Sequence, residues 1–281
     1  MKRVVLILIL FFAFFENFAQ KNFEKENLLA WCIVPFDKLK RGPVARIEML
    51  KNLGIKQYAY DWRAEHIQSF ATEIDLARKN NIAIEAIWMF IDNKTDKIGS
   101  LSTDNQRIID IASTKKLKTT IWLGFNNNFF EGLNHFEKVK KGADFLKYLA
   151  PNFAQKGFKI ALYNHGDWFG EPENEIEIIK ASGQKNVGIV YSFHHGHHQI
   201  NRFHSMFSAM KPYLVAVNLD GMDLKKSQIL PVGEGKSEKE MIEIIIKSGY
   251  NGRIGIIGHI MDEDVELVLK RNMDGLSKLL N

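Results

Sequence analysis

The sequence predicts an α/β fold, a (β/α)8 TIM barrel made of a single domain, and three observations support this prediction. Short apolar runs alternate with longer amphipathic segments from residue 28 to the end of the chain. Several of these runs are apolar at consecutive positions, which is typical of parallel strands covered on both faces. About 250 residues arranged in eight strand–helix units is also the usual size of this barrel.

An open, doubly wound parallel sheet is the competing fold. Such a sheet usually carries a glycine-rich phosphate-binding loop directly after its first strand. No such loop occurs between Phe36 and Pro43, where the first predicted strand has ended. The barrel is therefore the favoured architecture.

Each predicted strand is followed by one predicted helix. The strands cover residues 28–36, 56–62, 82–90, 119–125, 159–164, 187–193, 214–219 and 253–259. The helices cover residues 44–53, 64–80, 103–116, 135–153, 173–181, 199–210, 238–248 and 263–280. Ser102 and Ser237 are the expected N-caps of two helices. Four glycines follow helical patterns, where a left-handed residue ends a helix: Gly54, Gly157, Gly183 and Gly249.

The N-terminus has the layout of a secretory signal peptide. Lys2 and Arg3 precede an unbroken apolar run over residues 4–15, and Ala19 offers a small residue for cleavage. The run is shorter than the roughly 20 residues that a spanning helix needs. We therefore expect residues 1–19 to be the signal peptide and residues 20–281 to be the barrel domain of a secreted or periplasmic protein. An uncleaved membrane anchor is the alternative.

The composition excludes several other classes of protein. Hydrophobic residues make up 46% of the 281 residues, which excludes a disordered chain. Cys32 is the only cysteine, so there is no internal disulfide, and its apolar run predicts a buried, inert thiol. A net charge of +5 is small against 38 basic and 33 acidic residues, and gives no indication of a nucleic-acid partner.

Histidines gather at one end of the predicted barrel. In a TIM barrel the chemistry lies at the carboxyl ends of the strands and in the loops that follow them. Six of the nine histidines fall at these positions, namely His165, His194, His195, His197, His198 and His259. Because three separate strands supply them, we expect a functional cluster. The alternative is that some of them only form hydrogen bonds within loops.

Two kinds of chemistry would use such a cluster. Neutral imidazole is a common ligand of divalent metals, and it is also a general acid or base near neutral pH. We predict His165, His195 and His259 as catalytic acid–base groups. The same three side chains with Asp220 are the predicted metal ligands, although the run 194–198 lacks the spacing of a zinc motif.

Aromatic and polar side chains at the same end indicate a small carbohydrate ligand. The apolar faces of a sugar pack on aromatic rings, and its hydroxyls pair with polar groups. The predicted substrate-binding residues are Trp62, Arg63, Trp168, Glu171 and Asn218. The alternative for the aromatic residues is that they pack the top of the barrel.

Four segments resemble a known family. They are residues 162–174 (LYNHGDWFGEPEN), 187–197 (VGIVYSFHHGH), 216–222 (AVNLDGM) and 254–266, which contains IGIIGH. In these segments the chain resembles the xylose-isomerase-like TIM barrels of sugar phosphate isomerases and epimerases, most closely a secreted branch of Bacteroidetes-type bacteria. The resemblance implies a divalent cation, usually manganese, magnesium or zinc. It also implies two glutamates, on the fifth and eighth strands, that move protons at sugar carbons.

The family's ligand pattern is not retained. The family holds its metal with a Glu after strand five, an Asp and a His around strand six, a His near strand seven and a Glu at strand eight. Here these positions offer Tyr163 or Asn164, Tyr191 or Ser192, His194 or His195, Asn218, and Gly258 or His259. We therefore expect either a relocated site rich in histidine or a site that binds without reacting.

The expected function follows from these residues and from the predicted export. We expect a sugar isomerase or epimerase that acts on a free or oxidised sugar or a glycoside by abstracting a proton next to a carbonyl, with or without a metal. A non-catalytic carbohydrate-binding barrel that lost the metal ligands is one alternative. A 3-keto-glycoside lyase or a hydrolase is another.

Overall fold

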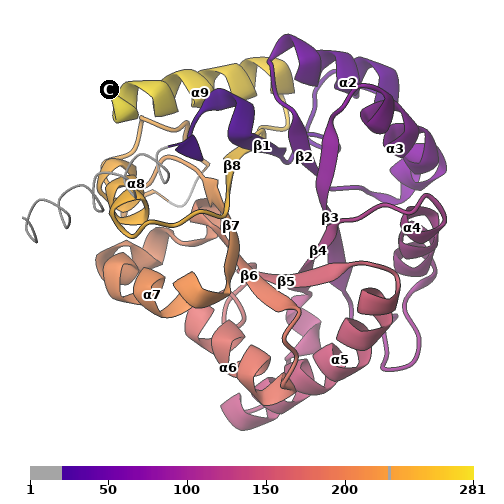
Figure 1. The fold of residues 1–281 in the computed structure, drawn as a ribbon. Coiled ribbons are helices and arrows are strands. Elements are labelled where there is room, and N and C mark those ends of the chain that lie inside the picture. The colour runs from indigo at the N-terminus through magenta and orange to yellow at the C-terminus, as the bar shows by residue number, and fades with distance from the viewer. Residues whose placement is uncertain (1–20, 227–228) are drawn as a thin grey trace, which may run out of the picture.

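The computed structural model describes residues 21–226 and 229–281, so the predicted signal peptide lies outside the described residues. Eight parallel strands form a closed barrel in the order of the sequence, and helices surround it (Figure 1). The prediction of a single (β/α)8 barrel is confirmed. Among the described residues, no helix is both long enough and apolar enough to cross a membrane.

The eight strands fall at the predicted places. They are β1 (Leu28–Trp31), β2 (Gln57–Tyr60), β3 (Ala83–Ile91), β4 (Thr120–Phe125), β5 (Lys159–Tyr163), β6 (Val187–Ser192), β7 (Leu214–Leu219) and β8 (Arg253–Ile257). The first strand ends five residues earlier than predicted. It ends there because Cys32 adopts a left-handed conformation, with φ of 57°, which turns the chain away from the ladder.

The helices lie outside the barrel. The α-helices are α2 (Pro43–Asn52), α3 (Phe70–Lys79), α4 (Thr103–Thr114), α5 (His135–Gln155), α6 (Pro172–Ser182), α7 (Phe203–Met210), α8 (Glu238–Lys247) and α9 (Val265–Leu280). Short 3-10 helices are η1 (Lys25–Asn27), η2 (Ala64–Ser69), η3 (Asn127–Phe129), η4 (Phe193–His195), η5 (His197–Arg202) and η6 (Lys211–Tyr213). Two predicted helices, 64–80 and 199–210, therefore begin with 3-10 turns.

The predicted helix ends are largely correct. The hydroxyl of Ser102 accepts a hydrogen bond from the N–H of Asn105 and caps α4. Ser237 is the N-cap residue of α8, but its side chain makes no capping bond. All four predicted terminal glycines have positive φ, between 67° and 83°.

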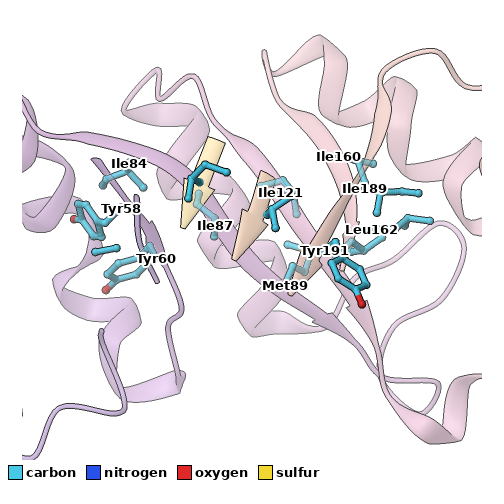
Figure 2. Packing of buried hydrophobic residues seen from close by; sticks show 14 of the residues in the cluster. Tyr58, Tyr60, Ile84, Ile87, Met89, Ile121, Ile160, Leu162, Ile189 and Tyr191 are labelled. Atoms are coloured by element: carbon cyan, nitrogen blue, oxygen red, sulfur yellow. The ribbon is translucent and has the colours of Figure 1, made fainter. Parts of the chain in front are cut away.

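The strands divide the core into two compartments. One set of side chains packs between the strands and the helices, and Figure 2 shows part of it, including Tyr58, Ile87 and Leu162. The alternate set points into the barrel, because successive side chains of a strand face opposite sides. This alternation along each strand decides which side chains line the interior at the carboxyl end of the barrel.

Aromatic rings fill the barrel interior. Trp31 lies with its ring centroid 4.9 Å from that of Trp122, and the Trp88 centroid lies 4.9 Å from that of Tyr163. Gly124 on β4 makes room for this packing, since a Cβ there would lie 2.7 Å from the Trp88 ring. The rings form a solid floor, so a ligand can only bind above them, at the carboxyl end.

Candidate functional site

The last inward side chains of five strands meet above the aromatic floor. Every second side chain of a strand faces the barrel interior. Ala59 on β2 faces inward, so Asp61 does too, and Ala216 on β7 likewise sets Asn218 and Asp220 inward. The last inward residues are Asp61, Phe90, His165, Asp220 and His259. We call the space that they border the barrel mouth.

Four histidines form a continuous cluster in the barrel mouth. The ring centroids of His165 and His195 are 4.6 Å apart, and those of His194 and His195 are 4.5 Å apart. His259 joins the cluster with its centroid 5.8 Å from that of His194. The structure thus brings together the three predicted catalytic histidines, and it adds His194.

The other two histidines of the predicted group, His197 and His198, form contacts outside the cluster. The ring of His197 is buried, with Nδ1 2.9 Å from the backbone oxygen of Asp223. His198 is exposed, and its Nε2 lies 2.8 Å from a carboxylate oxygen of Glu171. Neither ring joins the cluster in the mouth, because the chain winds into η4 and η5 directly after β6.

The clustered imidazoles are held neutral. Burial, together with the neighbouring histidines, lowers the pKa of His195 to about 2. Burial also lowers the pKa of His194 and of His259 to about 4. The pKa of His165 is lowered for the same reason. Each ring therefore carries a free lone pair at neutral pH, which a base or a hydrogen-bond acceptor requires.

Buried polar atoms without partners are concentrated at this end of the barrel. Nine-tenths or more of buried polar groups in proteins have a hydrogen-bond partner, so such atoms call for an explanation. Those around the mouth are Asp61 Oδ2, His165 Nδ1, Ser192 Oγ, His194 Nδ1, Asn218 Nδ2 and Oδ1, and Asp220 Oδ1. A polar ligand would satisfy them.

Asp61 is a residue that the sequence analysis missed. Its Oδ1 accepts a hydrogen bond of 3.1 Å from the N–H of Val34, and its Oδ2 has no partner. Burial raises the pKa of this carboxyl to about 7, against the opposing effect of the Arg63 guanidinium. The alternation from Ala59 was visible in the sequence and would have found it.

Trp62 and Arg63, which follow Asp61 and were predicted to bind substrate, lie farther from the centre of the mouth than Asp61. Trp62 packs against the outer core, and its indole N–H donates to the backbone oxygen of Trp88 over 2.6 Å. Arg63 is exposed, with its guanidinium carbon 5.5 Å from the centroid of the Phe36 ring. Phe36 in turn lies on His259, with 3.6 Å between the ring centroids. Arg63 and Phe36 thus cover part of the mouth.

Trp168 and Glu171 lie in the loop after β5, outside the centre of the mouth. Trp168 is half-buried and lines a cavity of about 350 Å³ between the loops after β4 and β5, which His165 also lines. The carboxylate of Glu171 forms an ion pair with Arg202, and it lies 2.8 Å from Nε2 of His198. That Glu171 binds substrate stays a prediction.

A hydrogen-bonded group lies directly beneath the histidines. The hydroxyl of Tyr163 accepts a hydrogen bond of 2.9 Å from the indole N–H of Trp31. Burial raises the pKa of the Tyr163 hydroxyl. The side chains of Ser192 and Asn218 lie beside this hydroxyl and lower its pKa in part. Asn218, predicted to bind substrate, is fully buried in this position.

These contacts decide between the alternatives left by the sequence. Asn164 is held by two hydrogen bonds to the backbone of Ser192, of 2.7 and 3.1 Å. Tyr191 points outward, where its hydroxyl donates to Gln199. The residues that face the interior on β5 and β6 are therefore Tyr163 and Ser192.

The predicted metal-binding residues do not fit a metal ion. Among residues 21–226 and 229–281, no group of three or more His, Cys, Asp or Glu side chains is placed to hold one. Asp220 lies 4.0 Å from His197 Nε2, whereas the ring of His259 contacts Phe36 at an interplanar angle of 45°. The inward Tyr163, Ser192 and Asn218 beneath them offer only hydroxyl and amide groups. The predicted set His165, His195, Asp220 and His259 is therefore not placed to hold a metal ion.

Comparison with known structures shows a shared fold. The IolI protein with a bound zinc atom is 13% identical over 90% of this chain and 97% of that chain, with a TM-score of 0.70. The 3-keto-D-glucoside 4-epimerase YcjR from E. coli is 14% identical over 90% and 98%, with a TM-score of 0.69. A D-psicose 3-epimerase determined with D-fructose is 14% identical over 89% and 96%, with a TM-score of 0.64.

The family assignment rests on a separate comparison. No curated protein matches the sequence. A family model described as xylose isomerase-like TIM barrel matches residues 58–278, which span β3 to β8 and most of the surrounding helices. The chain belongs to the xylose isomerase-like TIM barrel family.

Proposed function

We propose that this chain is an exported enzyme that moves a proton next to the carbonyl group of a sugar, as an isomerase or epimerase does. The observation that carries the proposal is the set of unpartnered buried polar atoms around four neutral imidazoles in the barrel mouth. A sugar supplies many hydroxyls and a carbonyl, which are the partners these atoms lack. Export rests on the predicted signal peptide.

The base in this proposal is the pair His165 and His195. Both rings are neutral, and the free Nδ1 of His165 has no partner within the protein. Proton abstraction next to a carbonyl needs an unprotonated base within reach of the C–H bond. The lowered pKa of His195 keeps its ring unprotonated across the physiological range, and the same lowering makes the ring a weaker base.

The developing negative charge on the substrate oxygen needs hydrogen-bond donors. The Tyr163 hydroxyl accepts from Trp31, so its own proton is available, and the amide of Asn218 has two unpaired donors. Preorganised donors of this kind stabilise an enolate in a dry site. The family's divalent cation would supply the same stabilisation, but no step here depends on it.

Two further features support a sugar as the ligand. The half-buried rings of Trp88 and Phe90 form a wall beside His165, with the Phe90 and His165 centroids 5.2 Å apart. Such rings pack on the apolar faces of sugars. The structures that share the fold include proteins that are sugar epimerases by name.

Proton exchange with heavy water tests the proposal. The purified protein is incubated in D2O with D-glucose, D-fructose, D-xylose and methyl 3-keto-β-D-glucoside, and loss of the C–H signal next to the carbonyl is followed by NMR. We expect exchange with at least one sugar, and a loss of about 100-fold or more in His195→Gln. His204→Gln is the matched control, since His204 is exposed on α7. Full exchange in His195→Gln would contradict the assigned base.

A lyase is the second candidate function. The cavity of about 350 Å³ beside His165 leaves room for a leaving group attached to the sugar. The lyase would begin with the same proton abstraction, and release of methanol from methyl 3-keto-β-D-glucoside would identify it. If sugars only raise the melting temperature and exchange no proton, the chain is a carbohydrate-binding barrel.

A further inference from the structure

Asp61 has the environment of a reacting group rather than of a structural one. Its side chain is 2% exposed. One carboxyl oxygen is fixed by the N–H of Val34, which orients the group, while the other oxygen has no partner. Leaving a buried carboxyl oxygen unpaired costs stability, so a structural role does not account for it.

Asp61 also lies on the wall opposite to the histidine pair. In the closed ring of eight strands, β2 and β6 are four strands apart and face each other across the barrel (Figure 1). Asp61 continues β2 toward the mouth, and His195 follows β6 in η4. A sugar bound between them would present one face to the carboxyl and the other to the imidazole.

Asp220 resembles Asp61, since one of its oxygens accepts from the N–H of Leu230 over 3.3 Å and the other has no partner. It differs in that its first oxygen also lies 4.0 Å from His197 Nε2. It also follows β7, the neighbour of β6, and so lies on the same side of the barrel as His195. The thiol of Cys32 also lies close to Asp61, and burial and that carboxyl both raise its pKa. Among the described residues of the mouth, Asp61 is therefore the carboxyl best placed to exchange a proton with a ligand.

We propose that Asp61 is the second proton-transferring residue of the site, opposite the His165–His195 pair, and that the reaction inverts a sugar carbon. This inference rests on the proposed function. It deepens that function by naming the reaction as an epimerisation with one acid–base group on each face of the substrate.

The step balances without an external oxidant or reductant. The imidazole lone pair takes the proton from the carbon next to the carbonyl. The electrons of the broken C–H bond form a C=C bond, and the carbonyl π electrons move to oxygen. The protonated carboxyl of Asp61 then delivers its proton to the opposite face of that carbon, and the carbonyl re-forms. The resulting imidazolium and carboxylate return to their starting forms by exchanging protons with water.

Protonation of Asp61 at the start of this step agrees with its surroundings. Burial raises its pKa against the opposing effects of the Arg63 guanidinium, of backbone hydrogen bonds to the carboxyl and of the buried Arg46. A carboxyl that stays protonated near neutral pH is a competent acid toward carbon.

Deuterium labelling of an exchanging sugar tests the inference. With the wild-type protein in D2O at early times, two groups on opposite faces place deuterium in the epimer that forms. For Asp61→Asn we expect formation of the epimer to fall by about 100-fold or more, while the starting sugar still exchanges its own proton through the histidine side. Asp61→Glu, which keeps a carboxyl, should recover part of the epimer formation.

Controls separate this result from misfolding. Glu175→Gln is the matched control, because Glu175 on α6 is also a buried carboxyl without a partner but faces the outer layer. Its variant should form the epimer at the wild-type rate. Circular dichroism and sugar-dependent melting of Asp61→Asn test whether the fold and the binding survive.

Three results would overturn the inference. The first is epimer formation by Asp61→Asn within threefold of the wild-type rate, in which case the proposed function stands without it. The second is a wild-type epimer that keeps the original hydrogen in D2O, which indicates a single base on one face. The third is the absence of exchange with every sugar in wild type, which removes the proposed function and the inference with it.

Discussion

The indole N–H of Trp31 on β1 donates a hydrogen bond of 2.9 Å to the hydroxyl of Tyr163 on β5, across the full width of the barrel. The two strands lie on opposite sides of the ring, so this bond connects walls that share no ladder. It also closes the barrel interior directly beneath the histidine cluster. The bond therefore couples the stability of the barrel to the geometry of the site.

Tyr163→Phe should destabilise the protein. The substitution removes the acceptor and leaves the indole N–H of Trp31 buried and unpaired, which costs about 1–3 kcal/mol. Urea unfolding of the wild type and of the variants Tyr163→Phe, Trp31→Phe and their combination gives the coupling energy between the two side chains. A double variant that loses the sum of both single effects would contradict a direct interaction.

His195→Asn should change how stability depends on pH. Burial lowers the pKa of His195 to about 2, against about 6.5 in an unfolded chain. The unfolded state thus binds one more proton below pH 6.5, and the wild type loses about 1.4 kcal/mol per pH unit through this group as the pH falls. The difference in unfolding free energy between wild type and variant should shrink at that rate between pH 6 and pH 4. A difference independent of pH would be evidence against a buried neutral ring.

Asp61→Asn should change the pH dependence of stability in the direction opposite to that of His195→Asn. Burial raises the pKa of Asp61 to about 7, so the folded state holds a proton that the unfolded state releases near pH 4. Stability from this group is present at low pH and is lost as the pH rises through 7. At pH 8 the variant should be more stable than wild type by an amount on the order of 1–4 kcal/mol. At pH 4, near the pKa of an unfolded aspartate, the two should differ little, and thermal melts at both pH values check this.

The protein should hold no stoichiometric divalent metal. In the described part of the chain, no three His, Cys, Asp or Glu side chains are placed to hold one ion, and the positions beneath the histidines offer only the hydroxyl and amide groups of Tyr163, Ser192 and Asn218. We expect far less than one equivalent of manganese, magnesium or zinc by mass spectrometry after desalting. We also expect no rise in melting temperature on adding these ions. One equivalent that is retained in wild type and lost in His195→Ala would disprove the prediction.

Gly124→Ala should be costly although alanine is small. A Cβ at this position would lie 2.7 Å from the Trp88 ring and 2.8 Å from the Phe90 ring. Overpacking of this kind typically costs about 1–3 kcal/mol. Because both rings border the mouth, the substitution should also lower sugar exchange. Gly42→Ala is the matched control for stability, because no atom lies within 4 Å of its would-be Cβ.

The barrel could be predicted from the sequence because each strand carries its own signal. Runs such as that of β8 are apolar and β-branched, and glycines with positive φ, such as Gly183, end the helices between the strands. These are local properties of the chain. They required no knowledge of contacts between distant residues.

The site could be predicted only in part. The parity of β5 and β8 brought His165 and His259 to the mouth as expected. Beyond the last ladder bond of β6 the chain winds into 3-10 helices, which carry His197 and His198 away from the other four histidines of the expected cluster. The ion pair of Glu171 with Arg202, 31 residues away in the sequence, could not be predicted either. Asp61 could have been found by counting alternate residues from Ala59.

The left-handed turn at Cys32 has a consequence for the entry of substrate. It turns the first loop across the mouth, where Asp37 anchors it through hydrogen bonds from the backbone N–H groups of Leu39, Arg41 and Val265. The same loop places the Phe36 ring on His259. Phe36 covers one side of the partly exposed His259 ring, so a sugar that packs on that side must first displace Phe36. The turnover rate can then be limited by how often a single phenylalanine swings aside, however fast the proton moves.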